Sequence, residues 1–570
     1  MLFRAFPAIS INKHRSLTAA LLVWSTLPHS EARAQRAPVD IPSLTNYQPS
    51  QEQRLDAVLD AAVPRPSALS ASTSDDPPSL ALPLEMSCMV VRDVDWRGAL
   101  PFPWLTTLAR IEGECIGEQG LRVLQDWLSR ELIARGFITT RLNIPKDEFQ
   151  DGHLVVQIVP GTIGKIRDEG GGIGWQPAAF PTGPGDALNV RDLDQAMENM
   201  LRLPGQSGVN FDLLPGARLG ATDIVIVHPE ESKRWHVVLN ADNQGVAATG
   251  RNQVGATVAI DSPLHLYDQL IVGLNNDAEL NNHEVASNAK SAAWNVPLGY
   301  ASLSIGASEW SSKQTIADVG PDYPYRSRTR RFDFGIGFAP YRSQDAKGAL
   351  QFKIVRRQEI NTVGDAPIAT QNHDITGYEA NFAHQQELAW ASVRAGAGVR
   401  GSLAGVSRDP GHVYGHANWN GRYWILGTNT SIDVPFEAGE RRFGYRGTLS
   451  VQWSPMPIPS TEYLQLGGRY TVRGFDGNSV LSAESGWVWR NEIATGAFAG
   501  SEAYVALDTG RVSGPSAGEL TGQTLAGTAL GLRGTYKTFG YDASLGLPLV
   551  KPSGFKARTA FLGLSLTARI

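Results

Sequence analysis

Beyond about Lys233 the chain alternates apolar and polar residues in runs of about ten. The runs are clearest at 443–453, 541–549 and 562–570. A side-chain period of two is typical of a β-strand, and one continuous apolar face opposite a polar face is what a strand needs between lipid and an aqueous lumen. Phe443 and Trp453, near the ends of one run, suit the aromatic girdles of such strands.

Strands in hydrocarbon must close into a barrel, because each backbone polar group there needs an internal partner. At ~10 residues per strand plus turns, residues 233–570 predict a transmembrane antiparallel β-barrel of about sixteen strands. The alternative is a soluble β-sandwich or propeller with inward apolar faces. The length of the runs and the absence of a blade-like repeat favour the barrel, so the fold class is mostly β.

The helical period appears only before the barrel. Residues 51–63 predict a short helix that ends at Pro64, and the segment from 66 to 83, rich in Ser, Pro and Asp, predicts a flexible linker. Apolar residues at three- and four-residue steps predict a longer helix that closes at Gly136; they are Leu121, Leu124, Leu128 and Leu132.

Short strands around these helices predict two small α+β modules in tandem, at 84–160 and 161–232. The first module has expected strands at 105–111, 139–144 and 153–159. The second has a helix at 190–203, stopped by Pro204 and Gly205, and its expected strands are 163–167, 209–213 and 223–227.

The N-terminus has the pattern of a secretory signal peptide. Basic residues at 13–15 precede an apolar stretch at 17–27 and the small residues at 32–34, which predicts a signal at 1–34. An amphipathic surface helix is the alternative. The signal carries Arg4, Lys13, Arg15 and Arg33 against Glu31, a net +3, so the mature chain carries −5 − 3 = −8. An acidic chain argues against a nucleic-acid partner.

Export changes the interpretation of the two cysteines, Cys88 and Cys115. In an oxidising compartment, cysteines 27 residues apart can form a disulfide worth ~3 kcal/mol, and two buried thiols are the alternative. Two cysteines without suitably spaced histidines do not make a zinc site.

Neither an enzyme nor a cofactor site is predicted. The 11 histidines are scattered, no His-Glu-x-x-His motif occurs, and no Ser/His/Asp set stands out. The glycines at 170–172 lack the Gly-Lys-Ser/Thr of a phosphate loop. We therefore expect no catalytic residues, no metal and no nucleotide.

Between two strand patterns lies a long segment, 454–481, that is rich in Pro and Gly and contains Val472, Arg473, Gly474 and Phe475. If this loop enters the lumen, Arg473 needs a buried partner, because an unpaired buried charge costs several kcal/mol. Asp508 has the same parity as Tyr504 and is therefore the best candidate; Glu492 is a second one. An ordinary loop salt bridge of little consequence is the alternative. Gly474 fits a tight turn.

Several short pieces, in their order along the chain, resemble the two-partner secretion transporters, the TpsB family, which are related to the barrel-assembly factors. These pieces are residues 134–137, 214–216, 472–475, 508–512 (Asp508 and Gly510 among them) and 545–549. The resemblance implies that the modules are periplasmic polypeptide-transport-associated (POTRA) domains, that 35–83 holds a pore-plugging helix and linker, and that Arg473 pairs with Asp508.

The resemblance further implies a function and a location. The chain would be an outer-membrane translocator that recognises a secreted exoprotein (TpsA-type) through its POTRA modules and exports it through a monomeric, lipid-embedded barrel without nucleotide hydrolysis. A barrel-assembly factor is the alternative, and a passive porin fits the two modules poorly. Two residues depart from the family pattern: Ala506 stands where an aromatic is common, and Ile570 replaces the usual terminal aromatic.

Overall fold

A computed structural model describes residues 79–570 except 99–101, 171, 231–232, 280–283, 317–322, 404, 414, 417–418 and 499. The expected signal at 1–34, the helix at 51–63 and the linker before residue 79 lie outside the described residues. No helix in the described part is long and apolar enough to cross a membrane.

The first module packs two helices on a small sheet. Strands β2 (Asp93–Arg97), β5 (His153–Val159) and β4 (Arg141–Asn143) form the sheet in the order β2-β5-β4, and β1 (Met89–Val90) pairs with β3 (Cys115–Ile116). Helix α3 (Glu118–Ala134) buries the four leucines of its apolar face, as predicted. Gly136 follows it with φ +94°, a left-handed conformation that favours glycine.

The predicted strand at 105–111 is wrong. The structure places Leu105 in helix α2 (Pro103–Leu108), whose first turn begins with proline. Proline is favoured at the first helical position, and Leu105, Leu108 and Ile111 recur at steps of three, which suits a helical turn better than a strand.

The second module repeats the strand arrangement of the first, with its first strand parallel to its last. Its sheet has the order β6-β8-β7, built from β6 (Thr162–Glu169), β7 (Asn210–Pro215) and β8 (Ala221–Val227). Helices α4 (Gln176–Ala179) and α5 (Val190–Leu201) accompany it, and the Asn189 side chain caps α5 by accepting a hydrogen bond from the Arg191 amide. Tyr267, from a turn of the barrel, is fully buried in this module's core.

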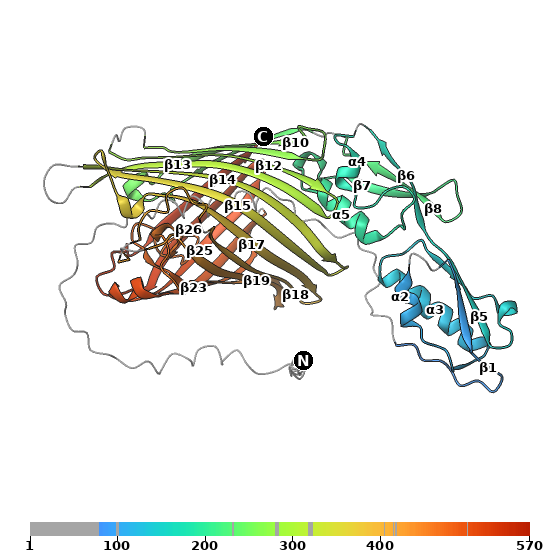
Figure 1. The fold of residues 1–570 in the computed structure, drawn as a ribbon. Helices are drawn as coiled ribbons and strands as arrows, with labels where there is room; N and C mark the ends of the chain where they lie inside the picture. Colours follow the sequence, from blue (N-terminus) through green and yellow to red (C-terminus); the bar gives the residue numbers. More distant parts are fainter. Residues whose placement is uncertain are drawn as a thin grey trace, which may run out of the picture. The chain divides into compact units, whose positions relative to one another are not determined.

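Apart from two short strands of one loop, the remaining strands close into one antiparallel barrel (Figure 1). The last strand of the barrel pairs with β9, the first. The barrel has 16 long strands, which confirms the prediction, and the two-residue β16 (Ala366–Pro367) adds to its rim. Ile570 exchanges two backbone hydrogen bonds with Val237. The long strands are β9 (Trp235–Asp242), β10 (Gln253–Asp261), β11 (Gln269–Asp277), β12 (Ala286–Leu298), β13 (Ala301–Ile316), β14 (Tyr323–Arg342), β15 (Ala346–Val363), β17 (His373–Leu388), β18 (Ala391–Ser402), β19 (Trp424–Ala438), β20 (Arg441–Trp453), β23 (Ser485–Gly496), β24 (Ser501–Ser513), β25 (Thr524–Tyr536), β26 (Phe539–Val550) and β27 (Phe561–Arg569).

The alternation of the barrel strands corresponds to outward and inward faces. On β24, Val505 and Leu507 are 55% and 56% exposed, whereas Tyr504 and Asp508 are 4% and 0% exposed. The apolar parity therefore faces outward, and the polar parity faces the lumen.

Candidate functional site: the inserted loop and its anchors

The loop between β20 and β23 folds against the inside of the barrel. It contains the short helix η5 (Ser460–Glu462) and a two-stranded sheet of β21 (Leu464–Leu466) and β22 (Leu481–Ala483). Its side chains form one hydrophobic cluster with inward residues of β23 to β25; the buried members include Leu466, Val472, Phe475, Leu481, Val488, Val512 and Leu525. Burial of these apolar side chains keeps the loop on the wall.

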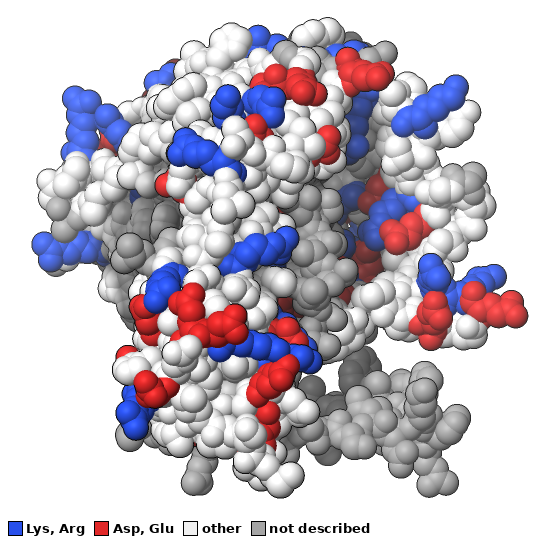
Figure 2. Space-filling view, turned by 90° about the vertical axis from the view of Figure 1, so that its right-hand side faces the viewer, with Lys and Arg blue, Asp and Glu red and all other residues white. Residues whose placement is uncertain are grey.

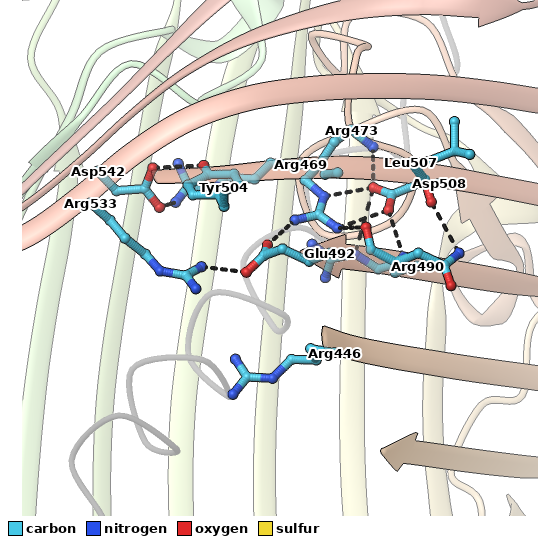
Figure 3. Close-up of polar contacts among 12 residues, drawn as sticks. Arg446, Arg469, Arg473, Arg490, Glu492, Tyr504, Leu507, Asp508, Arg533 and Asp542 are labelled. Atoms are coloured by element: carbon cyan, nitrogen blue, oxygen red, sulfur yellow. Dashed lines mark hydrogen bonds and ion pairs between the residues drawn. The ribbon is translucent and has the colours of Figure 1, made fainter. Parts of the chain in front are cut away.

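Arg473 is held by the wall through its backbone and its side chain (Figure 3). Its Nε donates to Asp508 Oδ2 at 2.7 Å and its Nη2 to Asp508 Oδ1 at 2.8 Å, while its amide donates to Asp508 Oδ2 at 2.9 Å. Nη1 also pairs with Glu492. The structure therefore places Arg473 against both acidic residues that the sequence predicted as its partners.

This contact is a forked ion pair shielded from solvent. The side chains of Arg473, Glu492 and Asp508 are 11%, 10% and 0% exposed. A bidentate guanidinium–carboxylate pair is directional, so it fixes the loop in orientation as well as in position. Removing one partner of a buried pair costs ~3–5 kcal/mol, because the other charge is left behind.

Further ion pairs extend the network along the wall. Arg533 joins Glu492 at 2.7 Å to Glu502 at 2.6 Å, and Arg469 of the loop pairs with Asp542 at 2.7 Å. Arg446 lies apart from this network (Figure 3) and pairs with Asp433 at 2.5 Å.

Two glycines allow the loop to approach the wall closely. Gly474 has φ +110°, and a Cβ added there would lie 2.5 Å from the Leu547 carbonyl oxygen. A Cβ added to Gly510 would lie 2.9 Å from Leu466 of the loop. Phe475 packs edge-on against Phe555, with ring centroids 5.8 Å apart. Ala506, which shares the inward parity of Asp508 on β24, is fully buried.

A second anchor holds the base of the loop, and the sequence reasoning missed it. The Glu462 carboxylate pairs with Arg357 of β15 and Arg400 of β18, each at 2.9 Å, and its carbonyl accepts from Gln452 at 2.7 Å. Burial would raise the pKa of Glu462, but the charges of Arg400 and Arg357 outweigh it and lower the pKa to about 2. Glu462 is the only acidic residue between Trp453 and Arg473, which is the one signal in the sequence.

Charged contacts also join the second module to the barrel. Glu198 of α5 pairs with Arg342 at 2.5 Å and with Lys347, at the turn between β14 and β15. Asn199 donates to the Gly299 carbonyl at 2.9 Å, and Tyr300 donates to Asp192 at 2.6 Å. Nothing in the sequence pattern links α5 to residues about 100 to 150 positions away, so these contacts were not predicted.

The two cysteines belong to the first module. Cys88 and Cys115 form a disulfide with a Cα–Cα distance of 5.3 Å, next to the β1–β3 pair. In the described part of the chain, no group of three or more His, Cys, Asp or Glu side chains is arranged to hold a metal ion.

Family models match three consecutive stretches of the chain between residues 90 and 534. A family model for the haemolysin secretion/activation protein ShlB/FhaC/HecB matches residues 220–534. A ShlB-type POTRA domain matches 90–161, and another POTRA domain matches 164–215.

Curated relatives and solved structures give the same result. The outer membrane transporter CdiB-2 of Burkholderia pseudomallei (strain 1026b) is 31% identical over 95% of this chain and 96% of that protein. The hemolysin transporter protein ShlB of Serratia marcescens is 26% identical over 79% of this chain and 82% of that protein. CdiB from Acinetobacter baumannii has the same fold, with a TM-score of 0.80 at 22% identity, over 94% of this chain and 100% of that structure. The chain therefore belongs to the ShlB/FhaC/HecB family, and it is an outer membrane transporter of the two-partner secretion type, with POTRA domains on the periplasmic side of its barrel.

Proposed function

We propose that this transporter recognises an unfolded partner exoprotein of the TpsA type with its POTRA modules and secretes it through the barrel, with the loop anchored by Arg473 as the gate. The observation that carries the proposal is the buried fork from Arg473 to Asp508 and Glu492. A loop whose tip is pinned to the inner wall by one directional contact can close the lumen in one state and release it in another.

Sheet edges in both modules support recognition of an extended chain. In the first module β4 is an edge strand, and in the second β7 is an edge strand with Leu213 and Leu214 38% and 46% exposed. An extended peptide can add to such an edge through backbone hydrogen bonds, with little demand on its sequence.

The surface charge favours backbone pairing over attraction of the passenger by a surface of one charge sign. On the face drawn in Figure 2, basic and acidic side chains are interspersed among large uncharged areas. Backbone pairing at an edge therefore supplies the main attraction. Folding of the passenger outside the cell supplies the driving force, so transport needs no nucleotide, and a single barrel in lipid suffices.

The test is secretion by Arg473→Ala in cells that express the partner exoprotein. We expect export to fall about tenfold or more, because the substitution leaves Asp508 and Glu492 without their shared cation. Arg446→Ala is the matched control, since it removes a lumen arginine that does not contact the loop. Heat-dependent gel mobility checks that both barrels fold. Undiminished export by a folded Arg473→Ala barrel would refute the gate.

A further inference from the structure

The outward face of β14 changes character abruptly along the strand. Phe332, Phe334, Ile336 and Phe338 are 48–56% exposed, as lipid-facing residues are. Directly beyond Phe332, the same face carries three basic residues at alternate positions, Arg326, Arg328 and Arg330. Residues two apart on a strand point to the same side, so these arginines continue the lipid-facing surface.

Neighbouring strands widen this basic row into a patch. Lys290 of β12 pairs across strands with Glu309, which pairs in turn with Arg330, so Lys290 lies on the same side of the sheet at one flank of β14. Arg356 of β15 pairs with Phe332 and lies on that side at the other flank. Five basic residues on three strands form what we call the rim patch: Lys290, Arg326, Arg328, Arg330 and Arg356.

Among the residues that the structure describes, acidic partners neutralise only part of the rim patch. Arg330 pairs with Glu309 at 2.7 Å, Arg356 with Asp374 at 2.9 Å, and Arg326 with Asp365 at 3.7 Å. Five cations against these three carboxylates leave +2 among these residues, although the whole chain carries −5. The Arg326, Arg330 and Arg356 side chains are 52%, 43% and 49% exposed, so their guanidinium groups remain accessible.

The rim patch lies at the cell-surface end of the barrel. The other end of β14 is Arg342, which pairs with Glu198 of the second POTRA module, and the POTRA modules are periplasmic. Arg326 lies 16 residues away on the same strand. The patch therefore borders the outer leaflet, just above the apolar band.

We propose that the rim patch binds the phosphorylated headgroup of a glycolipid of the outer leaflet, lipopolysaccharide, whose acyl chains lie on the apolar band around Phe332 and Ile354. Guanidinium groups bind phosphate oxygens in pairs, and alternate strand residues ~7 Å apart can engage more than one phosphate. A free anion would gain nothing from the aromatic surface directly below, which is why the headgroup of a lipid is the occupant.

The experiment measures how much lipopolysaccharide the purified full chain retains after exchange into detergent, and it compares variants with the unsubstituted chain. We expect Arg326→Gln/Arg328→Gln to lower the affinity for added diphosphorylated lipid A about thirty-fold, from the usual contribution of a basic residue near anionic lipid. The control is Arg441→Gln/Arg442→Gln, which removes two exposed arginines from the periplasmic end of β20. This control should bind as the unsubstituted protein does.

Further arms identify the source of the phosphate. Dephosphorylated lipid A should bind weakly to the unsubstituted chain, and inorganic phosphate should not displace the diphosphorylated lipid. This comparison needs no variant, so it stands even if the double variant fails to fold. Equal binding of phosphorylated and dephosphorylated lipid, equal binding by the folded double variant and the unsubstituted chain, or equal retention of phosphatidylglycerol would each overturn the proposal.

Discussion

Arg473 and Glu462 hold opposite ends of one loop to different parts of the barrel wall. Arg473, at the tip, reaches β23 and β24, while Glu462, at the base, reaches β15 and β18. A loop fixed at two places resists displacement at either. Release of the tip alone would therefore leave the base attached, and the loop would turn about Glu462.

Glu462→Gln tests this role of the base anchor. The amide removes the charge that balances Arg357 and Arg400, which should destabilise the closed loop by roughly 1.5–3 kcal/mol. We expect more frequent and larger channel openings in planar bilayers, with the barrel still folded. Glu309→Gln, which breaks an ion pair between β13 and β14 away from the loop, is the control.

Pairing Glu462→Arg with Arg400→Glu separates charge from shape. The double variant restores one ion pair with its signs reversed, so its channel openings should be less frequent than those of Glu462→Gln. Equally frequent openings in both variants, or equally rare openings in both, would contradict the anchor.

The tip contact was accessible to sequence reasoning and the base contact was not. Asp508 has the parity of Tyr504 and lies opposite Leu507, so parity alone assigns its side chain to the lumen. Glu462 lies in an irregular segment without parity. Its partners Arg357 and Arg400 lie on other strands, and their distance from Glu462 depends on barrel closure.

At the scale of elements, the pairing of α5 with the β14–β15 turn fixes the second module to the barrel. Burial would raise the pKa of Glu198, but Lys347 and Arg342 outweigh it and lower the pKa below its ordinary value of 4.5. A carboxylate whose pKa is lower in the folded than in the unfolded state stabilises the fold at pH values above its unfolded-state pKa. That contribution is lost as the pH falls through the folded-state pKa.

Acid should therefore weaken this contact, and Glu198→Gln should remove the pH dependence. Spin labels at two exposed positions, Lys165 of β6 and Arg441 of β20, report the distance between module and barrel by pulsed electron paramagnetic resonance. We expect the distance distribution to broaden below about pH 4.5 in a chain with native Glu198. In the Glu198→Gln background it should be broad at every pH. A distribution that stays equally narrow from pH 7 to pH 3 with native Glu198 would contradict this account.

Element boundaries show where pattern reasoning succeeds and fails. The predicted strand at 153–159 is β5, and the predicted helix at 190–203 is α5 with an earlier end. Short elements such as α2 carry too few residues for the period to decide, and there the proline at the helix start was the better signal.

At the scale of the whole molecule, the expected helix at 51–63 should reduce the conductance of the resting barrel. Deletion of residues 35–63 should raise single-channel conductance without ending secretion, because the POTRA modules and the anchored loop remain. Planar-bilayer recordings test this. Deletion of residues 66–78, which shortens only the expected linker, is the control, and an unchanged conductance in the 35–63 deletion would exclude a plug.

The barrel was predictable because few backbone structures can satisfy all their hydrogen bonds within lipid. Dyad alternation over ten-residue runs, as at 562–570, requires closed antiparallel strands once both faces are assigned. The contacts between separately predicted parts, such as Glu198 with Arg342, were beyond sequence reasoning, because complementary charges are too common to identify pairs.

The burial of Tyr267 links the folding of the second POTRA module to the folding of the barrel. This ring belongs to the β10–β11 turn, yet it completes the hydrophobic interior of the second POTRA module. A fragment that stops at residue 232 would lack it and would leave a hollow among Ile173, Leu203 and their neighbours. The module thus reaches its final compactness only after the β10–β11 hairpin has formed, so completion of the second POTRA module depends on folding of the barrel.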